Sequence, residues 1–153
     1  MIRSAHYGDI PQVAGLISDF YQESKYDAPP INPEKTAHVL KAYIDDAGEK
    51  SFFEVIDTDD RKNTLVGFMI GERTHDLWSD ALKTVEVALY VRPLFRGRPS
   101  AGRLLLNFAK WAEAVPSMIR VEASSGITEE NAARVYAKLG WSRRGTLHGV
   151  ELH

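Results

Sequence analysis

Apolar side chains recur every three to four residues in four stretches of the chain, which is the spacing of one buried helix face. The first of these stretches covers residues 10–20 and follows a short candidate strand at residues 1–5. Asp9 stands at the expected N-cap, and Pro11 falls in the first turn, where its missing N–H has no helical partner to lose. The pattern therefore predicts a strand followed directly by an amphipathic helix.

Three more helices are predicted from the same periodicity. The second begins near Pro33 and is expected to end at Gly48, because glycine readily ends a helix. The third begins at Pro99 or Ser100 and carries a stripe of leucine, phenylalanine and tryptophan. The fourth spans residues 128–140, with a threonine N-cap resembling a capping box and a glycine at its end.

Strand-type patterns separate the second helix from the third and recur towards the end of the sequence. Residues 51–57 and 64–73 are separated by a polar turn and are predicted to form a hairpin. Residues 84–93 are rich in β-branched side chains and give the strongest strand pattern in the chain. Further strands are expected at residues 117–124 and 141–153.

The predicted order of elements is β-α-α-β-β-β-α-β-α-β. Short turns between neighbouring strands favour antiparallel pairing, whereas the strand–helix–strand passage over residues 84–123 favours a parallel pair joined by a right-handed crossover. The expected fold is α/β (α+β), with a mixed, mainly antiparallel central sheet flanked by helices on both faces. The length of 153 residues, without a linker-like tract, predicts a single domain over residues 1–153.

Charge and residue content narrow the classes of function. The net charge of −2 lacks the basic excess of nucleic-acid-binding and membrane-surface proteins, so neither partner is expected. The sequence contains no cysteine, which excludes disulfides, thiolate metal ligands and a thiol nucleophile. The histidines lack metal-ligand spacing, so no metal is expected. The lack of an apolar leader or membrane-length run is typical of a cytoplasmic protein.

A basic turn after the strand at residues 84–93 is the first candidate for chemistry. It leads into the third helix, whose unpaired N–H groups and dipole favour a phosphate group at this end. Arg96 and Arg98 add positive charge, and Gly97 permits close approach to the backbone. Pro99 removes one donor, yet proline is favoured at the first helical position and is compatible with a phosphate site. The alternative is an ordinary solvated connection.

Two segments resemble motifs of the GNAT superfamily of N-acetyltransferases. Residues 89–105, LYVRPLFRGRPSAGRLL, are similar to its acetyl-CoA-binding segment, with Pro99 in place of the middle glycine. Residues 134–141, RVYAKLGW, are similar to the family's late helix, and residues 2–17 to its first strand and helix. The matching positions are Val91, Pro93, Arg96, Gly97, Ala101, Leu104 and Leu105 in the first motif, and Tyr136, Lys138, Gly140 and Trp141 in the second.

The resemblance implies an acetyl-CoA-dependent N-acyltransferase that moves an acetyl group to a primary amine by direct transfer in a ternary complex. It implies that the pantetheine arm lies beside residues 89–91, with the Val91 N–H towards the thioester carbonyl, and that the pyrophosphate lies on the basic turn. The family's usual asparagine is displaced, which leaves Asn131 as the candidate. The residues expected to bind acetyl-CoA are Leu89, Tyr90, Val91, Arg96, Gly97, Arg98, Ser100, Ala101, Gly102 and Asn131.

The resemblance also implies catalytic roles. Tyr136 occupies the position of the family's general acid, and a phenol is protonated at neutral pH. Glu86, a charged residue inside an apolar strand, is the candidate general base, and a β-bulge would change the phase of this strand. Glu122 on the next strand, or water without a dedicated side chain, are the alternatives.

The amine acceptor is expected near the end of the first helix, the Pro-rich loop after it and the connection before the strongest strand. Tyr26, Asp76 and Trp78 are the candidate substrate-binding residues, because acids and aromatic rings bind cationic amines. Exposed loops commonly carry such residues without binding anything, which is the alternative. A small-molecule amine and a protein or peptide amine are both compatible with the sequence, as are a monomer and a homodimer.

Two other functions are compatible with the same motifs. One is a non-catalytic GNAT-like module that binds CoA or a protein partner as a regulator, which the proline in the turn and the displaced asparagine favour. The other is a nucleotide-binding protein that uses the same basic turn. The intact Tyr136 favours the enzyme.

Overall fold

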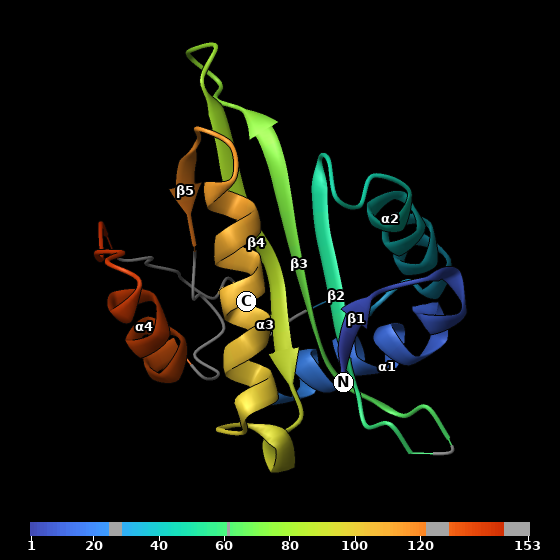
Figure 1. Cartoon of the computed structure of the whole chain (residues 1–153). Coiled ribbons are helices and arrows are strands. Elements are labelled where there is room, and N and C mark those ends of the chain that lie inside the picture. Colours follow the sequence, from blue (N-terminus) through green and yellow to red (C-terminus); the bar gives the residue numbers. More distant parts are fainter. Residues whose placement is uncertain (25–28, 61, 122–128, 146–153) are drawn as a thin grey trace.

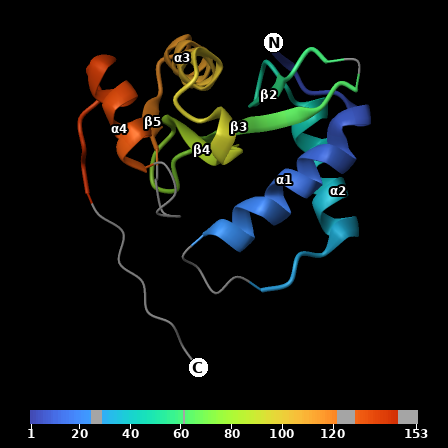
Figure 2. The ribbon, with the colours of Figure 1, turned by 90° about the horizontal axis from the view of Figure 1, so that it is seen from below.

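A computed structural model describes residues 1–24, 29–60, 62–121 and 129–145 of the chain. It contains a five-stranded sheet with the order β1-β2-β3-β4-β5 and with helices on both faces (Figure 1, Figure 2). The strands are β1 (Ile2–Ser4), β2 (Ser51–Asp57), β3 (Leu65–His75), β4 (Leu82–Val91) and β5 (Met118–Arg120). The helices are α1 (Ile10–Glu23), α2 (Pro33–Asp45), α3 (Pro99–Glu113) and α4 (Glu129–Lys138), with short 3₁₀ turns η1 (Tyr7–Asp9) and η2 (Pro93–Phe95).

The order of elements confirms the mixed α/β arrangement expected from the sequence. The second helix ends at Asp45 rather than at Gly48, which lies in the turn before β2 with a φ of 92°. Residues 141–145 form neither helix nor strand, and residues 146–153 lie outside the described part, so the strand predicted there stays a prediction. Within the described ranges, no helix has the length and apolar character needed to cross a lipid bilayer.

Asp9 is the N-cap residue of α1, as predicted, but its carboxylate accepts no capping hydrogen bond from this helix. It instead accepts hydrogen bonds from the His6 N–H at 2.9 Å and from the Arg3 guanidinium at 2.7 Å. Burial alone would raise the pKa of Asp9, but these hydrogen bonds outweigh burial and lower it. Arg3 also donates to the Asp57 carboxylate at 3.2 Å. The three side chains of Arg3, Asp9 and Asp57 therefore connect the start of the chain with the end of β2.

The pairing of strands changes from antiparallel to parallel at the β5 edge of the sheet. Strands β1 to β4 pair antiparallel in sequence order, whereas β4 and β5 are parallel and are joined by the crossover through α3. The described part of β5 pairs only with Lys83, Thr84 and Val85 of β4. Beyond Val85, β4 continues to Val91, and no other described strand pairs with this edge of it. Within the described residues, the outer edge of β4 is therefore unpaired over residues 86–91, and we call this stretch the open edge of β4.

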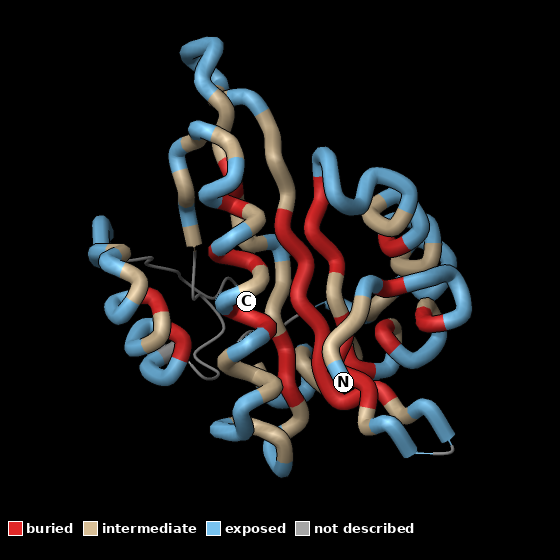
Figure 3. The backbone as a smooth tube through the Cα atoms, in the orientation of Figure 1, coloured by how far each residue is buried: buried red, intermediate tan, exposed pale blue. Residues whose placement is uncertain are grey.

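Helices cover both faces of the central strands, and β2 and the first seven residues of β3 are buried almost throughout (Figure 3). On one face, Val13 of α1 and Leu40 of α2 pack with Phe68 of β3. On the other face, Leu104 and Phe108 of α3 pack against the sheet. Burial of each such side chain contributes roughly 1.5–3 kcal/mol, so both helical layers hold the sheet.

Gly71 on β3 marks the closest approach of α3 to the sheet. A Cβ atom at this position would lie 2.4 Å from Cε2 of Phe108 and 3.3 Å from Cζ3 of Trp111. Phe108 is fully buried, and the close packing of a protein core resists movement of its ring. Only glycine therefore fits between α3 and the sheet at this point.

We expect Gly71→Ala to lower the free energy of unfolding by about 1–3 kcal/mol, the usual effect of overpacking a core. Gly15→Ala is the matched control, because nothing lies within 4 Å of the place that its methyl group would take on the exposed side of α1. This control should raise stability by about 0.5–1 kcal/mol, since alanine favours a helix interior. Urea unfolding followed by circular dichroism measures both, and an unchanged midpoint for Gly71→Ala would contradict the close contact.

Candidate active site

A β-bulge in the middle of β4 sets the direction of its side chains. Ile70 of β3 pairs with Ala88 and Gly71 pairs with Glu86, so Val87 has no partner of its own. The extra residue reverses the alternation of side chains along the strand. Glu86 therefore shares the face of Leu89 and Val91, which pack towards α3 and α4, instead of the face of Ala88 and Tyr90.

The bulge brings the two predicted catalytic side chains into contact. The Tyr136 hydroxyl of α4 donates a hydrogen bond of 2.8 Å to Oε2 of Glu86. Burial raises the pKa of Glu86 to about 7, although the hydrogen bond from Tyr136 acts in the opposite direction. Burial, followed by the nearby carboxylate, raises the pKa of Tyr136. The pair thus combines a carboxyl group that titrates near neutral pH with a phenol that stays protonated.

The open edge of β4 begins next to this pair, because Glu86 directly follows the last residue that pairs with β5. The Arg92 N–H donates to the Val66 carbonyl of β3 at 2.8 Å, which places Arg92, Tyr90 and Ala88 in the hydrogen-bonded positions of the β3–β4 ladder. The N–H groups of Leu89 and Val91 consequently point the opposite way, towards the open edge. The N–H group of Tyr90 points towards β3 and not towards the open edge.

The basic turn leads into α3 as the sequence predicted, with Pro99 as the first helical residue. Gly97 has a φ of 74°, in the left-handed region that favours glycine. In the part of the chain that the structure describes, the N–H groups of Gly97, Arg98 and Ser100 donate no hydrogen bond. The turn therefore presents three backbone donors at a helix N-terminus, which is a favourable arrangement for a phosphate group.

Two of the predicted donors in this turn are already engaged. The Arg96 N–H donates to the Pro93 carbonyl at 3.3 Å, and the Ala101 N–H donates to the Arg98 carbonyl at 3.1 Å. The Arg98 guanidinium lies over the Phe95 ring, 4.7 Å from its centroid.

The Arg96 side chain is directed to the end of α1. Its guanidinium forms a bidentate ion pair with Glu23, in which Nη2 lies 2.7 Å from Oε2, and its Nε donates to the Val91 carbonyl at 2.7 Å. The hydrogen bonds from Arg96 lower the pKa of Glu23, as does a bond of 3.0 Å from the Tyr90 hydroxyl. Most of the positive charge of Arg96 is thereby balanced within the protein.

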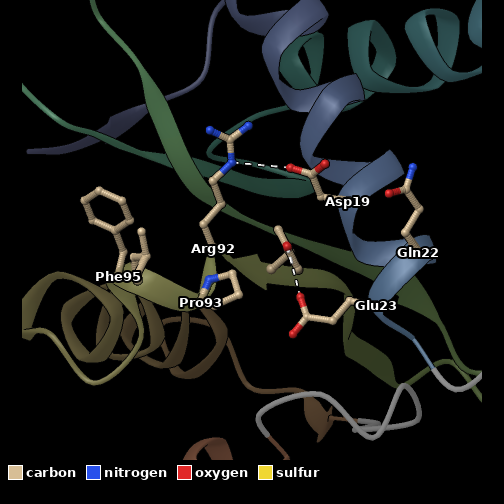
Figure 4. A pocket seen from close by; sticks show the side chains of 8 residues that line it. Asp19, Gln22, Glu23, Arg92, Pro93 and Phe95 are labelled. Carbon is tan, nitrogen blue, oxygen red and sulfur yellow. Dashed lines mark hydrogen bonds and ion pairs between the residues drawn. The ribbon is translucent and has the colours of Figure 1, made fainter.

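A cleft of about 560 Å³ lies between the last turns of α1 and the end of β4 (Figure 4). Asp19 of α1 pairs with Nε of Arg92 at 3.3 Å along one wall, and the floor includes Pro93 and Phe95. Asp19 and Glu23 were not among the residues predicted for the site. They stand four residues apart on α1, which places both carboxylates on one helix face. This spacing is the sequence feature that could have identified them. The lining residues are Asp19, Gln22, Glu23, Tyr90, Arg92, Pro93, Leu94 and Phe95.

The other candidate residues do not gather around the Glu86–Tyr136 pair. Asp76 and Trp78 lie in the exposed β3–β4 hairpin, at the opposite end of β4 from the basic turn (Figure 1). Asp76 accepts a hydrogen bond from the Trp78 N–H at 3.1 Å. Asn131 is exposed on α4, while Tyr26 and Glu122 lie outside the described residues. Within residues 1–24, 29–60, 62–121 and 129–145, no cluster of acids and histidines could hold a metal ion.

Comparisons with solved structures find the same fold in acetyltransferases of distant sequence. A predicted acetyltransferase with acetyl-CoA from Clostridium acetobutylicum has a TM-score of 0.74 and 13% identity, over 99% of this chain and 95% of that one. Glucosamine-6-phosphate N-acetyltransferase from Arabidopsis thaliana has a TM-score of 0.72 and 14% identity, over 100% and 98%. An acetyltransferase of Trypanosoma brucei has a TM-score of 0.72 and 14% identity, over 99% of both chains.

Sequence comparison identifies the family directly. No curated protein sequence matches this chain. The model of the acetyltransferase (GNAT) family matches residues 13–141, which include most of α1, the basic turn and α4. This match extends over most of the sequence and coincides with the fold shared by the solved acetyltransferases. The chain therefore belongs to the GNAT family of acetyltransferases.

Proposed function

We propose that this protein moves an acetyl group from acetyl-CoA to a primary amine by direct transfer in a ternary complex. The observation that carries the proposal is the 2.8 Å hydrogen bond between Tyr136 and Glu86, beside the open edge of β4. One partner can accept a proton near neutral pH and the other can donate one. Amine acetylation requires both of these capacities.

The open edge and the basic turn offer complementary contacts for acetyl-CoA. The outward N–H groups of Leu89 and Val91 suit the amides of a pantetheine arm, and one of them suits the thioester carbonyl as it becomes an oxyanion. The free N–H groups of Gly97, Arg98 and Ser100 suit the pyrophosphate. With Pro99 as the first helical residue, the missing N–H falls where a helix has no internal partner.

The chemical steps follow from proton balance. The attacking amine must lose a proton, and the departing thiolate of CoA must gain one. In this proposal the Glu86 carboxylate accepts the amine proton, and the Tyr136 hydroxyl donates its proton to the sulfur. Since the two groups are hydrogen-bonded, Glu86 can return the proton to Tyr136 and restore the pair. The lack of cysteine fits direct transfer without a thiol acyl-enzyme.

The cleft beside α1 is our candidate for part of the acceptor site. It adjoins the end of β4, and the exposed Asp19 carboxylate at its wall suits a cationic amine of a small molecule, protein or peptide. Tyr26, Asp76 and Trp78 stay predictions as acceptor-binding residues. We further propose a single domain over residues 1–153 that acts in the cytoplasm as a monomer or homodimer.

A non-catalytic module that binds CoA or a protein partner is the second candidate function. The ion pair between Arg96 and Glu23 favours this module, because an arginine bound to Glu23 is not available to a phosphate group. The exposed Asn131 side chain, displaced from the usual family position, points the same way.

Thermal shift with acetyl-CoA followed by a thiol-release assay with a panel of amines separates the two functions. The proposal expects acetyl-CoA to raise the Tm and at least one amine to release CoA thiol. Binding without thiol release from small amines, peptides and proteins would favour the module. A larger shift with ATP than with CoA would instead indicate a nucleotide-binding protein.

Tyr136→Phe should lower kcat about a hundredfold or more, since it removes the proposed proton donor while keeping the ring. The dissociation constant of acetyl-CoA, measured by calorimetry, should stay near the wild-type value because the proposed contacts to CoA are backbone N–H groups of β4 and the basic turn, which the substitution leaves in place. Tyr43→Phe is the matched control, because it removes a tyrosine hydroxyl that donates to a glutamate, Glu72, at 3.0 Å on the α2 side of the sheet. A kcat equal to that of the wild type would remove Tyr136 from the mechanism.

Activity should rise with pH through about 7, because Glu86 must be ionised to accept a proton and burial raises its pKa to about 7. Glu86→Gln should abolish this acidic limb and lower kcat/KM, while deprotonation of the free amine still increases the rate at higher pH. Full pH–rate profiles with one acceptor measure the change. Superimposable profiles would exclude Glu86 and leave water or Glu122 as the base.

A further inference from the structure

The end of α4 adopts a backbone arrangement that places one aromatic residue directly on Tyr136. Gly140 has a φ of 81°, and its N–H donates to the Ala137 carbonyl at 3.0 Å. The Trp141 N–H donates to the Tyr136 carbonyl, also at 3.0 Å. This pair of bonds is the Schellman motif, in which the residue two positions after the C-cap, here Trp141, packs against the last turn of the helix. The backbone itself therefore brings Trp141 to Tyr136.

The two rings form a parallel stack. Their centroids lie 5.0 Å apart with an angle of 9° between the ring planes. Tyr136 is only 8% exposed, and its hydroxyl is held by Glu86 at the other end of the side chain. One face of the phenol is thus fixed by an indole while its oxygen meets the carboxylate.

The indole is itself held from α3. Its Nε1–H donates to Oε1 of Glu113, the last residue of α3, at 2.7 Å. The ring also meets Phe108 of α3 edge to face, with centroids 6.4 Å apart. The sheet that carries Glu86 packs against α3. Since α3 in turn holds Trp141, and Trp141 stacks on Tyr136, these contacts connect the sheet with Tyr136 by a second route.

We propose that Trp141 and Glu113 are positioning residues that hold the Tyr136 hydroxyl against Glu86. The inference rests on the proposed function, in which these two groups move the protons. A phenyl ring at position 141 could stack on Tyr136 but could not donate to Glu113. The tryptophan therefore adds a hydrogen-bonded anchor to the stacking.

Ordinary core packing is the alternative explanation, and the surroundings of Glu86 allow a test. Tyr136 is the titratable group that the structure places in contact with Glu86 from α4. Gly71 of β3 lies opposite Glu86. Arg120 of β5 lies opposite Val85, the residue before Glu86. Since the bond from Tyr136 lowers the pKa of Glu86, loosening Tyr136 should raise that pKa. A loss of packing alone would lower stability without this change.

The test compares Trp141→Leu, Trp141→Phe and Glu113→Ala, with Val135→Ala as the matched control on α4. Val135 packs against the same core but, as an aliphatic residue, forms no ring stack with Tyr136. Trp141→Leu should lower kcat roughly tenfold, the upper range for one aromatic pair, with little change in the KM for acetyl-CoA. Trp141→Phe and Glu113→Ala should each lower kcat roughly threefold, the scale of one modest hydrogen bond.

A double-mutant cycle isolates the anchor. Glu113→Ala should have no further effect on kcat in the Trp141→Phe background, because the indole N–H is already absent. The acidic limb of the pH–rate profile should move to higher pH in Trp141→Leu and stay in place in Val135→Ala. Unchanged kcat and limb in Trp141→Leu, or equal changes in the control, would overturn the proposal.

A measurement without turnover separates this inference from the proposed function. The carboxyl carbon of Glu86, followed by ¹³C NMR during a pH titration, reports its pKa in each variant. A higher midpoint in Trp141→Leu than in wild type supports the positioning role even if no amine is acetylated. An unchanged midpoint in an enzyme that still depends on Tyr136 would contradict the positioning role alone.

Discussion

The single extra residue in β4 determines which side chains meet at the start of its open edge. Without the bulge at Val87, the alternation of the strand would turn Glu86 towards α1, away from Tyr136. With it, the carboxylate lies on the α4 side, beside the point where β5 stops pairing with β4. One irregularity in the ladder thus brings together the two groups that we propose as acid and base, and places them at the start of the open edge of β4.

The rest of the site depends on two helix ends that meet the same strand. The N-terminus of α3 presents free backbone donors, and the C-terminus of α1 provides Glu23, which binds Arg96. Glu23 directly precedes the segment that connects α1 with α2, the region expected to contribute to the acceptor site. The ion pair therefore links the proposed phosphate turn to the region that we propose for the acceptor.

Hydrophobic periodicity predicted the helices and most strands because each buries a regular apolar face, and local motifs identified the basic turn and Tyr136. Interactions between distant residues were not predictable in this way. Arg96 and Glu23 are 73 residues apart, and Arg96 read alone looks like a phosphate ligand. The Asp9 carboxylate looked like a cap because no local signal indicates that Arg3 will bind it. The Glu86–Tyr136 contact likewise depends on a bulge that β4 adopts only against β3.

Burial of Glu86 also affects the folding equilibrium. Its pKa is raised from 4.5 to about 7 in the folded protein, so the folded state binds this proton more tightly than the unfolded chain. The associated stability is fully present below pH 4.5 and is lost as the pH rises through about 7. The ionised carboxylate, which the proposed role as a base requires, is therefore the form that favours unfolding. If Glu86 acts as we propose, its reactive form lowers the stability of the fold that holds it.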